Sequence, residues 1–450
     1  MNKRIAALSY LVLAASMLSH LGFPQFASAA VIGTNTPAQS LTAERIAALP
    51  LAQQPAWKEY LSHSMQQSRA DRAFFDAEVR EHGVKEPVIP PSSNSARSIP
   101  MDESAAWYGS AEARRIADII VSFQTPAGGW SKNLDMTRHP RAPGESFAPN
   151  NVSRYLGQAD FDAPHDAHWN YVGTFDNDAT ITELRYLAKV ITAAGTNNSA
   201  PYRAAFLRGI DYSLAAQYPN GGWPQVWPLE GGYHDTITYN DDAMINILNW
   251  LRDVSTGANE FGFVPGATRA LVATAVQRGV DCLLATQIVA NGCRTVWCQQ
   301  HDPLTLQPAA GRNYEMPSAV SAESADIMTF LMDQPNPTPQ VVAAVHAAAA
   351  WFDKTKILGR AYERTGEDGR HLVADPGHGP IWARYYEIGT DRPIFGDRDK
   401  TIHDNVEDLS RERRNGYAWY RDTPAGALEQ YASWSKTHPQ TGASTGKATP

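Results

Sequence analysis

The fold is decided by residues 217–244, QYPNGGWPQVWPLEGGYHDTITYNDDAM, which combine a Gly-Gly pair, three aromatic residues interleaved with prolines, and several aspartates. Apolar residues recur at helical spacing on both sides, at Phe206, Leu207, Ile210, Leu214 and at Met244, Ile247, Leu248, Leu251. The stretch is therefore predicted to be a long loop between two helices. Such a loop is more often a binding or catalytic surface than a mere connection, although tryptophans that plug the core would give the same pattern.

The signature of this stretch recurs along the chain. A predicted helix is followed by QTPAGGW at 124–130, by QYPNGGW at 217–223, and by a fainter version at 287–297 with Asn291-Gly292 in place of the glycine pair. This recurrence indicates an internal repeat. The glycines allow the backbone to reverse after each helix, and the tryptophan can fold back over the helix end.

Between these loops the helices pair into three hairpins, each with a short internal connection. The pairs are 180–193 with 201–216, 241–253 with 267–287, and 318–333 with 338–353. Strand-like alternation is scarce, so the prediction is an all-α protein, an α/α toroid built of about three helical hairpins. The long links at 124–179, 217–240, 288–317 and from 354 onward should then gather on one face of the ring.

The N-terminal part divides into two segments. Residues 1–29 combine Lys3 and Arg4, an apolar run and Ala27-Ser28-Ala29, which predicts a signal peptide and a secreted protein, extracellular or periplasmic, with no membrane span after cleavage. Residues 30–100 read as a helical arm with two or three short helices, ending in a linker rich in proline and serine. The catalytic domain is expected at 101–438 and a polar tail at 439–450.

Charge and cysteine content narrow the possible functions. The formal net charge is −8, and loss of the two cations Lys3 and Arg4 makes it −10, so nonspecific nucleic-acid binding is not expected. A polyanionic substrate would need local cations or a bound metal. The spacing of Cys282, Cys293 and Cys298 fits no zinc motif and leaves open one disulfide or three free thiols.

Two oxygen-rich clusters stand at predicted helix entrances. The first is Asp176-Asn177-Asp178, followed by Thr180 and Glu183, which resemble a capping box; the second is 240–242, Asn-Asp-Asp. Calcium prefers several carboxylate and amide oxygens, so two such clusters on one face form a candidate cation site. For either cluster alone, a helix N-cap is the simpler interpretation.

The third and fourth links carry arginines. Arg312 lies among apolar and aromatic residues and is three residues before Glu315, so a structural ion pair is as plausible as a functional role. The fourth link mixes basic residues, among them Arg384 and Arg398, with a similar number of acidic ones, so an internally paired charge network is the simplest interpretation.

Several motifs together resemble one known family. They are GGWSKN at 128–133, TFDNDAT at 174–180, QYPNGGWPQVWP at 217–228, YNDDAM at 239–244, WCQQHD at 297–302, GRNYEMPS at 311–318, and FGDRDK at 395–400 with ERRNGY at 412–417. In this order they resemble the family 10 polysaccharide lyases, pectate lyases with an α/α toroid. The resemblance covers about residues 101–435 and leaves residues 30–100 outside.

The resemblance implies calcium-assisted β-elimination of polygalacturonate, which gives 4,5-unsaturated oligogalacturonates. Arg312 would be the catalytic base. The calcium ligands would be Asp176, Asn177 and Asp241, with Asp178 open. Substrate would be held by Lys132, Asn177, Arg384 and Arg398. Trp130, Trp223 and Tyr314 would stack on sugars, with core packing an equal alternative for the two tryptophans. Lys400 departs from the family pattern, which has a small residue there.

Two rival functions remain. Helix-then-Gln-Gly-Trp turns also occur in terpene cyclases with α/α barrels, but the sequence has no run of closely spaced acids of the protonating type. A noncatalytic pectin-binding module would bind the polymer without forming product. For each of these functions we expect a monomer.

Overall fold

The computed structural model describes residues 30–93, 98–195 and 198–440. The predicted signal peptide at 1–29 lies outside these residues, as does the part of the predicted tail from 441 to 450. Within the described ranges, none of the helices is both long and apolar enough to cross a membrane.

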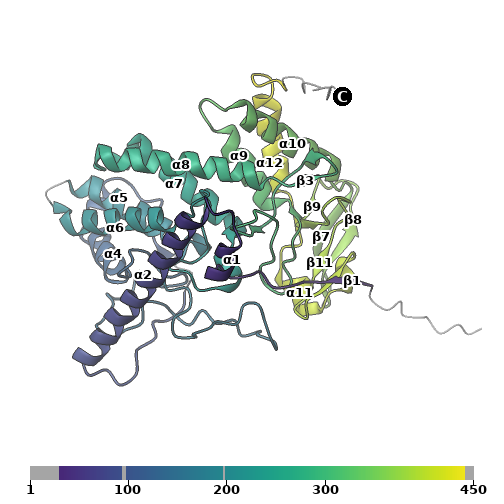
Figure 1. Cartoon of the computed structure of the whole chain (residues 1–450). Coiled ribbons are helices and arrows are strands. Elements are labelled where there is room, and N and C mark those ends of the chain that lie inside the picture. The colour runs from purple at the N-terminus through teal and green to yellow at the C-terminus, as the bar shows by residue number, and fades with distance from the viewer. Residues whose placement is uncertain (1–29, 94–97, 196–197, 441–450) are drawn as a thin grey trace, which may run out of the picture.

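The three predicted hairpins are present. They are α5 (Ile181–Ala194) with α6 (Ala200–Ala216), α7 (Ala243–Thr256) with α8 (Gly266–Thr286), and α9 (Ala322–Met332) with α10 (Pro339–Thr355). Helix α4 (Ala111–Ser122) packs on the first pair and α12 (Thr423–Trp434) on the third, as Figure 1 shows. The α/α toroid is thereby confirmed.

Each repeat is closed by the same two side-chain contacts, which explains why the Gln and Trp recur. The Nε2 atom of Gln217 donates to the carbonyl of Gly221 at 3.0 Å and to that of Ala275, on α8, at 2.9 Å. Gln124 and Gln287 make the equivalent bonds to their own loop and to the second helix of the following hairpin, at Ala205 on α6 and Ala344 on α10. The indoles of Trp130, Trp223 and Trp297 donate to carbonyls near the end of the preceding helix.

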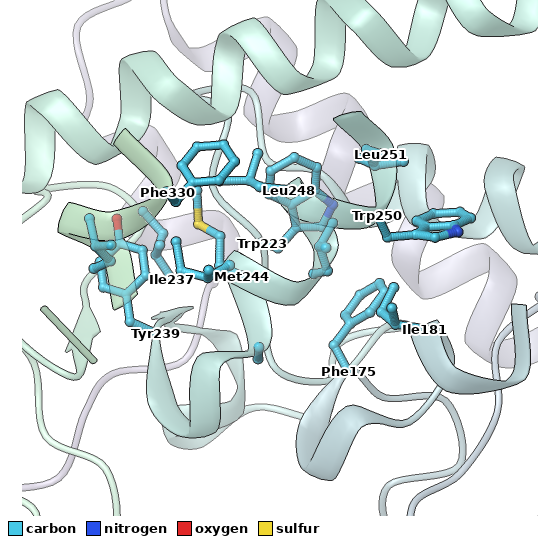
Figure 2. Close-up of a cluster of buried hydrophobic side chains, with 14 of the residues drawn as sticks. Phe175, Ile181, Trp223, Ile237, Tyr239, Met244, Leu248, Trp250, Leu251 and Phe330 are labelled. Carbon is cyan, nitrogen blue, oxygen red and sulfur yellow. The ribbon is translucent and has the colours of Figure 1, made fainter. Parts of the chain in front are cut away.

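The core lies between the hairpins and directly beneath the second long link. Figure 2 shows Met244, Leu248 and Leu251 of α7 beside Trp223 from that link and Phe330 from α9. Trp130 and Trp223 are fully buried, so both tryptophans pack in the core and are not available to stack on a sugar.

The N-terminal arm differs from its predicted form. It consists of β1 (Val31–Thr34), α1 (Ala43–Ala47) and a single 28-residue helix α2 (Gln54–Glu81), which projects from the body in Figure 1. The prediction of two or three short helices was wrong because the polar run at 62–72 conceals a continuous helix. After Pro55 in the first turn, α2 contains neither proline nor glycine, so nothing interrupts it.

Short antiparallel ladders join the four long links to one another. Residues 174 and 226 form a bridge, β2 (Ile237–Thr238) pairs with β5 (Gln300–His301), and β6 (Ala319–Val320) pairs with β10 (Tyr385–Tyr386). The links therefore lie side by side, which confirms that they gather on one face.

The fourth link contains more strand than its sequence indicates. β7 (Arg360–Thr365) and β8 (Gly369–Ala374) form a hairpin. A sheet of β1, β12 (Thr401–His403) and β11 (Phe395–Gly396) lies nearby, and β13 (Tyr420–Arg421) pairs with β9 (Trp382–Ala383). A small ribbon, β3 (Val289–Ala290) with β4 (Cys293–Arg294), belongs to the third link. The sequence left open whether the three cysteines form one disulfide. In the structure Cys282, Cys293 and Cys298 are all free thiols.

Candidate active site

The two acidic clusters form two facing turns, η2 (Asp176–Asp178) and η5 (Asn240–Asp242), which contact each other. Both turns hold non-glycine residues in the left-handed region, with φ of 53° at Asn177, 62° at Asp178, 48° at Asp241 and 60° at Asp242. Each such residue costs free energy, and consecutive ones are typical of functional sites.

Helix capping does not explain these clusters. The N-cap residue of α7 is Asp242, and its side chain makes no capping hydrogen bond. Thr180 precedes α5 with a φ of 68°, and its hydroxyl donates instead to the carbonyl of Thr174 at 2.8 Å. The prediction that the Thr180 hydroxyl caps the helix was wrong, because this hydroxyl holds the loop together.

Asp176 is the buried member of the first cluster. Its carboxylate accepts hydrogen bonds from Lys132 Nζ at 2.6 Å and from Gln225 Nε2 at 3.0 Å. Burial raises the pKa of Asp176, but the charge and hydrogen bond of Lys132 outweigh it, so the pKa lies below its usual value. The Lys132 ammonium also lies 3.4 Å from the centre of the Tyr171 ring, a cation–π contact that fixes its position.

Asp241 is more open, with 42% of its side chain exposed, and its nearest cation is Arg384 Nη2 at 3.8 Å. Partial burial, followed by repulsion from Asp176, raises the pKa of its carboxyl group, although Arg384 and Arg312 act in the opposite direction. A hard cation bound between two carboxylates that repel each other would remove this repulsion.

Asn177 lies next to this pair. Its side chain is exposed, and its Nδ2 donates to Asn133 Oδ1 at 3.2 Å. The donor set of two carboxylates and one amide suits calcium in ligand type. Among residues 30–93, 98–195 and 198–440, however, no three His, Cys, Asp or Glu side chains converge on a metal position. Substrate or water oxygens would therefore have to complete the coordination.

Arg384 is nearly buried, with 5% exposure, and it pairs with Glu323 of α9. Its guanidinium lies 4.7 Å from the centre of the Tyr417 ring. A chain of hydrogen bonds continues from Glu323 through Gln299 to the Tyr385 hydroxyl and on to Tyr417. Arg384 is thus held rigidly from two sides.

Arg312 makes the ion pair that its spacing predicts. Its Nε donates to Glu315 Oε1 at 2.9 Å, and Nη2 lies 2.7 Å from the same oxygen. Burial lowers the pKa of Arg312, but the negative charge of Glu315 outweighs it and raises the pKa well above the usual value. Gly311 makes room for this pair, since a Cβ there would stand 2.5 Å from Glu315 Oε2.

Arg398 belongs to the same cluster of charges. It is held by Glu412, with Nε to Oε2 at 2.6 Å, and 26% of its side chain is exposed. The guanidinium groups of Arg398 and Arg312 lie 5.3 and 5.4 Å from the centre of one ring, that of Tyr314. Tyr314 itself is buried, so its ring supports the two arginines.

Asp176, Asp241, Arg312 and Arg384 therefore surround one region. The turns that carry the two aspartates contact each other, and Arg384 lies beside Asp241 and the Tyr417 ring. The Tyr417 hydroxyl donates to Glu315, the partner of Arg312. Lys132 and Arg398 join it through Asp176 and Tyr314. Sequence analysis missed the supporting residues Gln225, Gln299, Glu323 and Tyr417. Gln225, Gln299 and Tyr417 stand in motifs already quoted, but nothing in one sequence showed that they support the charged groups.

Comparisons with known proteins identify the family of this chain. The family model for pectic acid lyase matches residues 124–428. Two structures of a family 10 polysaccharide lyase from Cellvibrio cellulosa are similar to this chain, each with a TM-score of 0.61. One is a mutant in complex with trigalacturonic acid, 30% identical over 76% of this chain and 99% of its own; the other is 32% identical over 75% and 99%. Among curated proteins, the sequence has no match. The chain therefore belongs to the pectic acid lyase family and is a pectate lyase of polysaccharide lyase family 10.

Proposed function

We propose that this enzyme cleaves polygalacturonate by β-elimination with the help of calcium, after export from the cell. The observation that carries this proposal is the facing pair Asp176 and Asp241, surrounded by Lys132, Arg312 and Arg384. The acidic groups can bind a cation, and the basic groups can bind the carboxylate of a uronate. The bound cation and the basic groups would together allow a chain with a net charge of −8 to bind a polyanion.

The chemical problem is the weak acidity of the C5 proton. It lies α to a carboxylate, and the enolate-like transition state places further negative charge on that group. Calcium held by Asp176, Asn177 and Asp241 would neutralise the substrate carboxylate and so stabilise this charge. Elimination then breaks the C5–H bond and the bond from C4 to the glycosidic oxygen, and it forms the C4–C5 double bond. The departing oxygen takes a proton from water and leaves as the hydroxyl group of the second product.

Arg312 is the proposed base that takes the C5 proton. The contacts with Glu315 use Nε and Nη2, which leaves Nη1 outside that pair. The ion pair with Glu315 also makes it harder for Arg312 to act as a base, because it raises the pKa of Arg312. The proposal therefore requires that desolvation by substrate and neighbouring positive charge outweigh Glu315.

Lys132, Asn177, Arg384 and Arg398 are the proposed substrate-binding residues. Each of the three cations is already paired with a protein carboxylate, which fixes its direction before substrate arrives. Arg398 is the most exposed of them and can offer its planar guanidinium to a uronate.

Product analysis on polygalacturonate tests the calcium step. We expect 4,5-unsaturated oligogalacturonates from the untreated enzyme, loss of product after chelation, and recovery when calcium is added back. Full activity in the chelated enzyme would contradict the calcium proposal. Binding of the polymer without product, under every metal and pH condition, would favour a noncatalytic pectin-binding module.

Export has its own test. If residues 1–29 are a signal peptide, the N-terminal sequence of enzyme recovered outside the cytoplasm begins at Ala30, whereas a mature chain that still begins at Met1 would contradict it. We also propose that the mature enzyme is a monomer without affinity for nucleic acid.

A further inference from the structure

The N-terminal strap, defined here as residues 31–47 from β1 to α1, lies outside the region that matches the family model. In Figure 1 it runs from β1, at the edge of the sheet that contains β11, to α1 at the centre of the molecule. It crosses three of the four long links. Strand β1 pairs with β12 of the fourth link, Arg45 pairs with Asp302 of the third, and Leu41 N donates to Asp235 Oδ2 of the second at 2.9 Å.

One side chain of the strap holds the loop that carries Arg312. Asn35 is buried, with 4% exposure, and its Nδ2 donates to the carbonyl of Arg312 at 3.2 Å and to that of Asn313 at 3.0 Å. A primary amide has two N–H donors, so both are used on this loop.

The backbone around Asn35 connects the same loop to the one that carries Arg398. Asn35 N donates to the carbonyl of Lys400 at 2.8 Å, and Asn313 Nδ2 donates to the carbonyl of Arg398 at 2.7 Å. Asn35 therefore stands at the junction of two loops whose arginines share the Tyr314 ring.

We propose that Asn35 is a positioning residue for Arg312, and that the N-terminal strap is a working part of the active site. Reacting groups must be held to a fraction of an ångström, and a displacement of about 1 Å can cost roughly a hundredfold in rate. Without the Asn35 amide, the Asn313 carbonyl loses a buried hydrogen bond, the Arg312 carbonyl keeps only the one from Glu315 N, and the Arg312 loop gains freedom. The inference rests on the proposed role of Arg312.

The test compares Asn35→Ala with Ser64→Ala, a matched control. Ser64 lies on α2, is 2% exposed, and its Oγ accepts a hydrogen bond from Leu229 N at 2.9 Å, away from the Arg312 loop. Both variants lose one buried hydrogen-bonding side chain of the N-terminal arm. We measure Tm, and then kcat and KM on polygalacturonate, at a temperature well below the lower Tm.

For Asn35→Ala we expect kcat to fall about tenfold or more while KM changes less than about twofold, because an element that places the base is lost. Ser64→Ala should lower Tm and keep kcat. Hydrogen exchange at residues 312–316 should be faster in Asn35→Ala only. Equal kcat in the two variants would overturn the inference.

A variant that does not fold leaves the inference testable. Asn35→Ser, which keeps one short donor, takes the place of Asn35→Ala in the same comparison and should lose less rate. Arg312→Ala distinguishes a failure of the strap inference from a failure of the proposed base. If Arg312→Ala is inactive while both Asn35 variants match Ser64→Ala, only the strap inference fails; if Arg312→Ala is active, the proposed base fails by itself.

Discussion

The contact of Arg312 with Glu315 sets the protonation state in which the guanidinium meets the substrate. Glu315 is buried, and it also accepts a hydrogen bond from the Tyr417 hydroxyl at 2.9 Å. Its negative charge raises the pKa of Arg312. Glu315 therefore places and orients the side chain while making it a weaker supplier of the free base.

Glu315→Gln separates these two effects. If Arg312 is the base, removal of the negative charge lowers the pKa of Arg312, and the rising limb of kcat against pH moves to lower pH. If Arg312 serves only as a cation, kcat falls without such a shift. Kinetics over a pH series decide between the two. Glu412→Gln is the matched control, since Glu412 pairs with Arg398 and should leave the position of the limb unchanged.

Glu183 offers a pH test of stability outside the charged cluster. It is fully buried, and burial raises its pKa from 4.5 to about 7, an effect that the backbone N–H groups of Glu183 and Thr180 offset only in part. An acid with a raised folded-state pKa stabilises the fold fully only below its unfolded pKa. That contribution is lost as pH rises from about 4.5 to about 7.

Glu183→Gln removes this loss. We expect the variant to exceed the parent in free energy of unfolding at pH 8, by on the order of 3 kcal/mol, and the gap to close near pH 4. Urea unfolding over a pH series measures it. A gap that stays constant with pH would contradict the buried-acid account. The exposed Glu86 is the control, because Glu86→Gln should change the unfolding free energy by less than about 0.5 kcal/mol.

At the scale of elements, the repeated Gln-to-Trp turn joins the end of one helix to the second helix of the following hairpin. Gln217 ties its own loop to α8 through two carbonyls, and it is 5% exposed. Gln217→Ala should therefore destabilise the fold by on the order of 2 kcal/mol, since the buried carbonyls of Gly221 and Ala275 each lose one hydrogen bond. Chemical denaturation measures the change. Gln277→Ala, on the exposed face of α8, should cost less than about 0.5 kcal/mol, and equal costs would contradict this account of the repeat.

This turn was predictable from sequence because its Gln, Gly-Gly and Trp keep a fixed spacing and each residue makes a contact within or next to the turn. Helix α2 was not, because its polar middle has no apolar stripe long enough to show a continuous helix. The structure explains the small residue of the family pattern at position 400, because φ there is 75°, in the left-handed region that favours glycine; it does not explain why this chain has Lys400.

At the scale of the whole molecule, the order of short and long connections was enough to predict that four distant links meet. That argument needs only the alternation of helices in a ring. It could not show which side chains support the charged groups, because Glu323, Gln299 and Tyr417 act through contacts between links. The same argument could not predict that residues 31–47 contact the links. These residues carry no motif, and most of their contacts with the links are single hydrogen bonds.

The central claim is that the converged links form one catalytic centre in which Arg312 removes the C5 proton. The most direct measurement is the rate of unsaturated uronate formation by Arg312→Ala on polygalacturonate, together with its affinity for an oligogalacturonate. We predict a rate at least about a thousandfold below the parent, with affinity changed by less than about tenfold. A variant that forms unsaturated product at the parental rate would contradict the account.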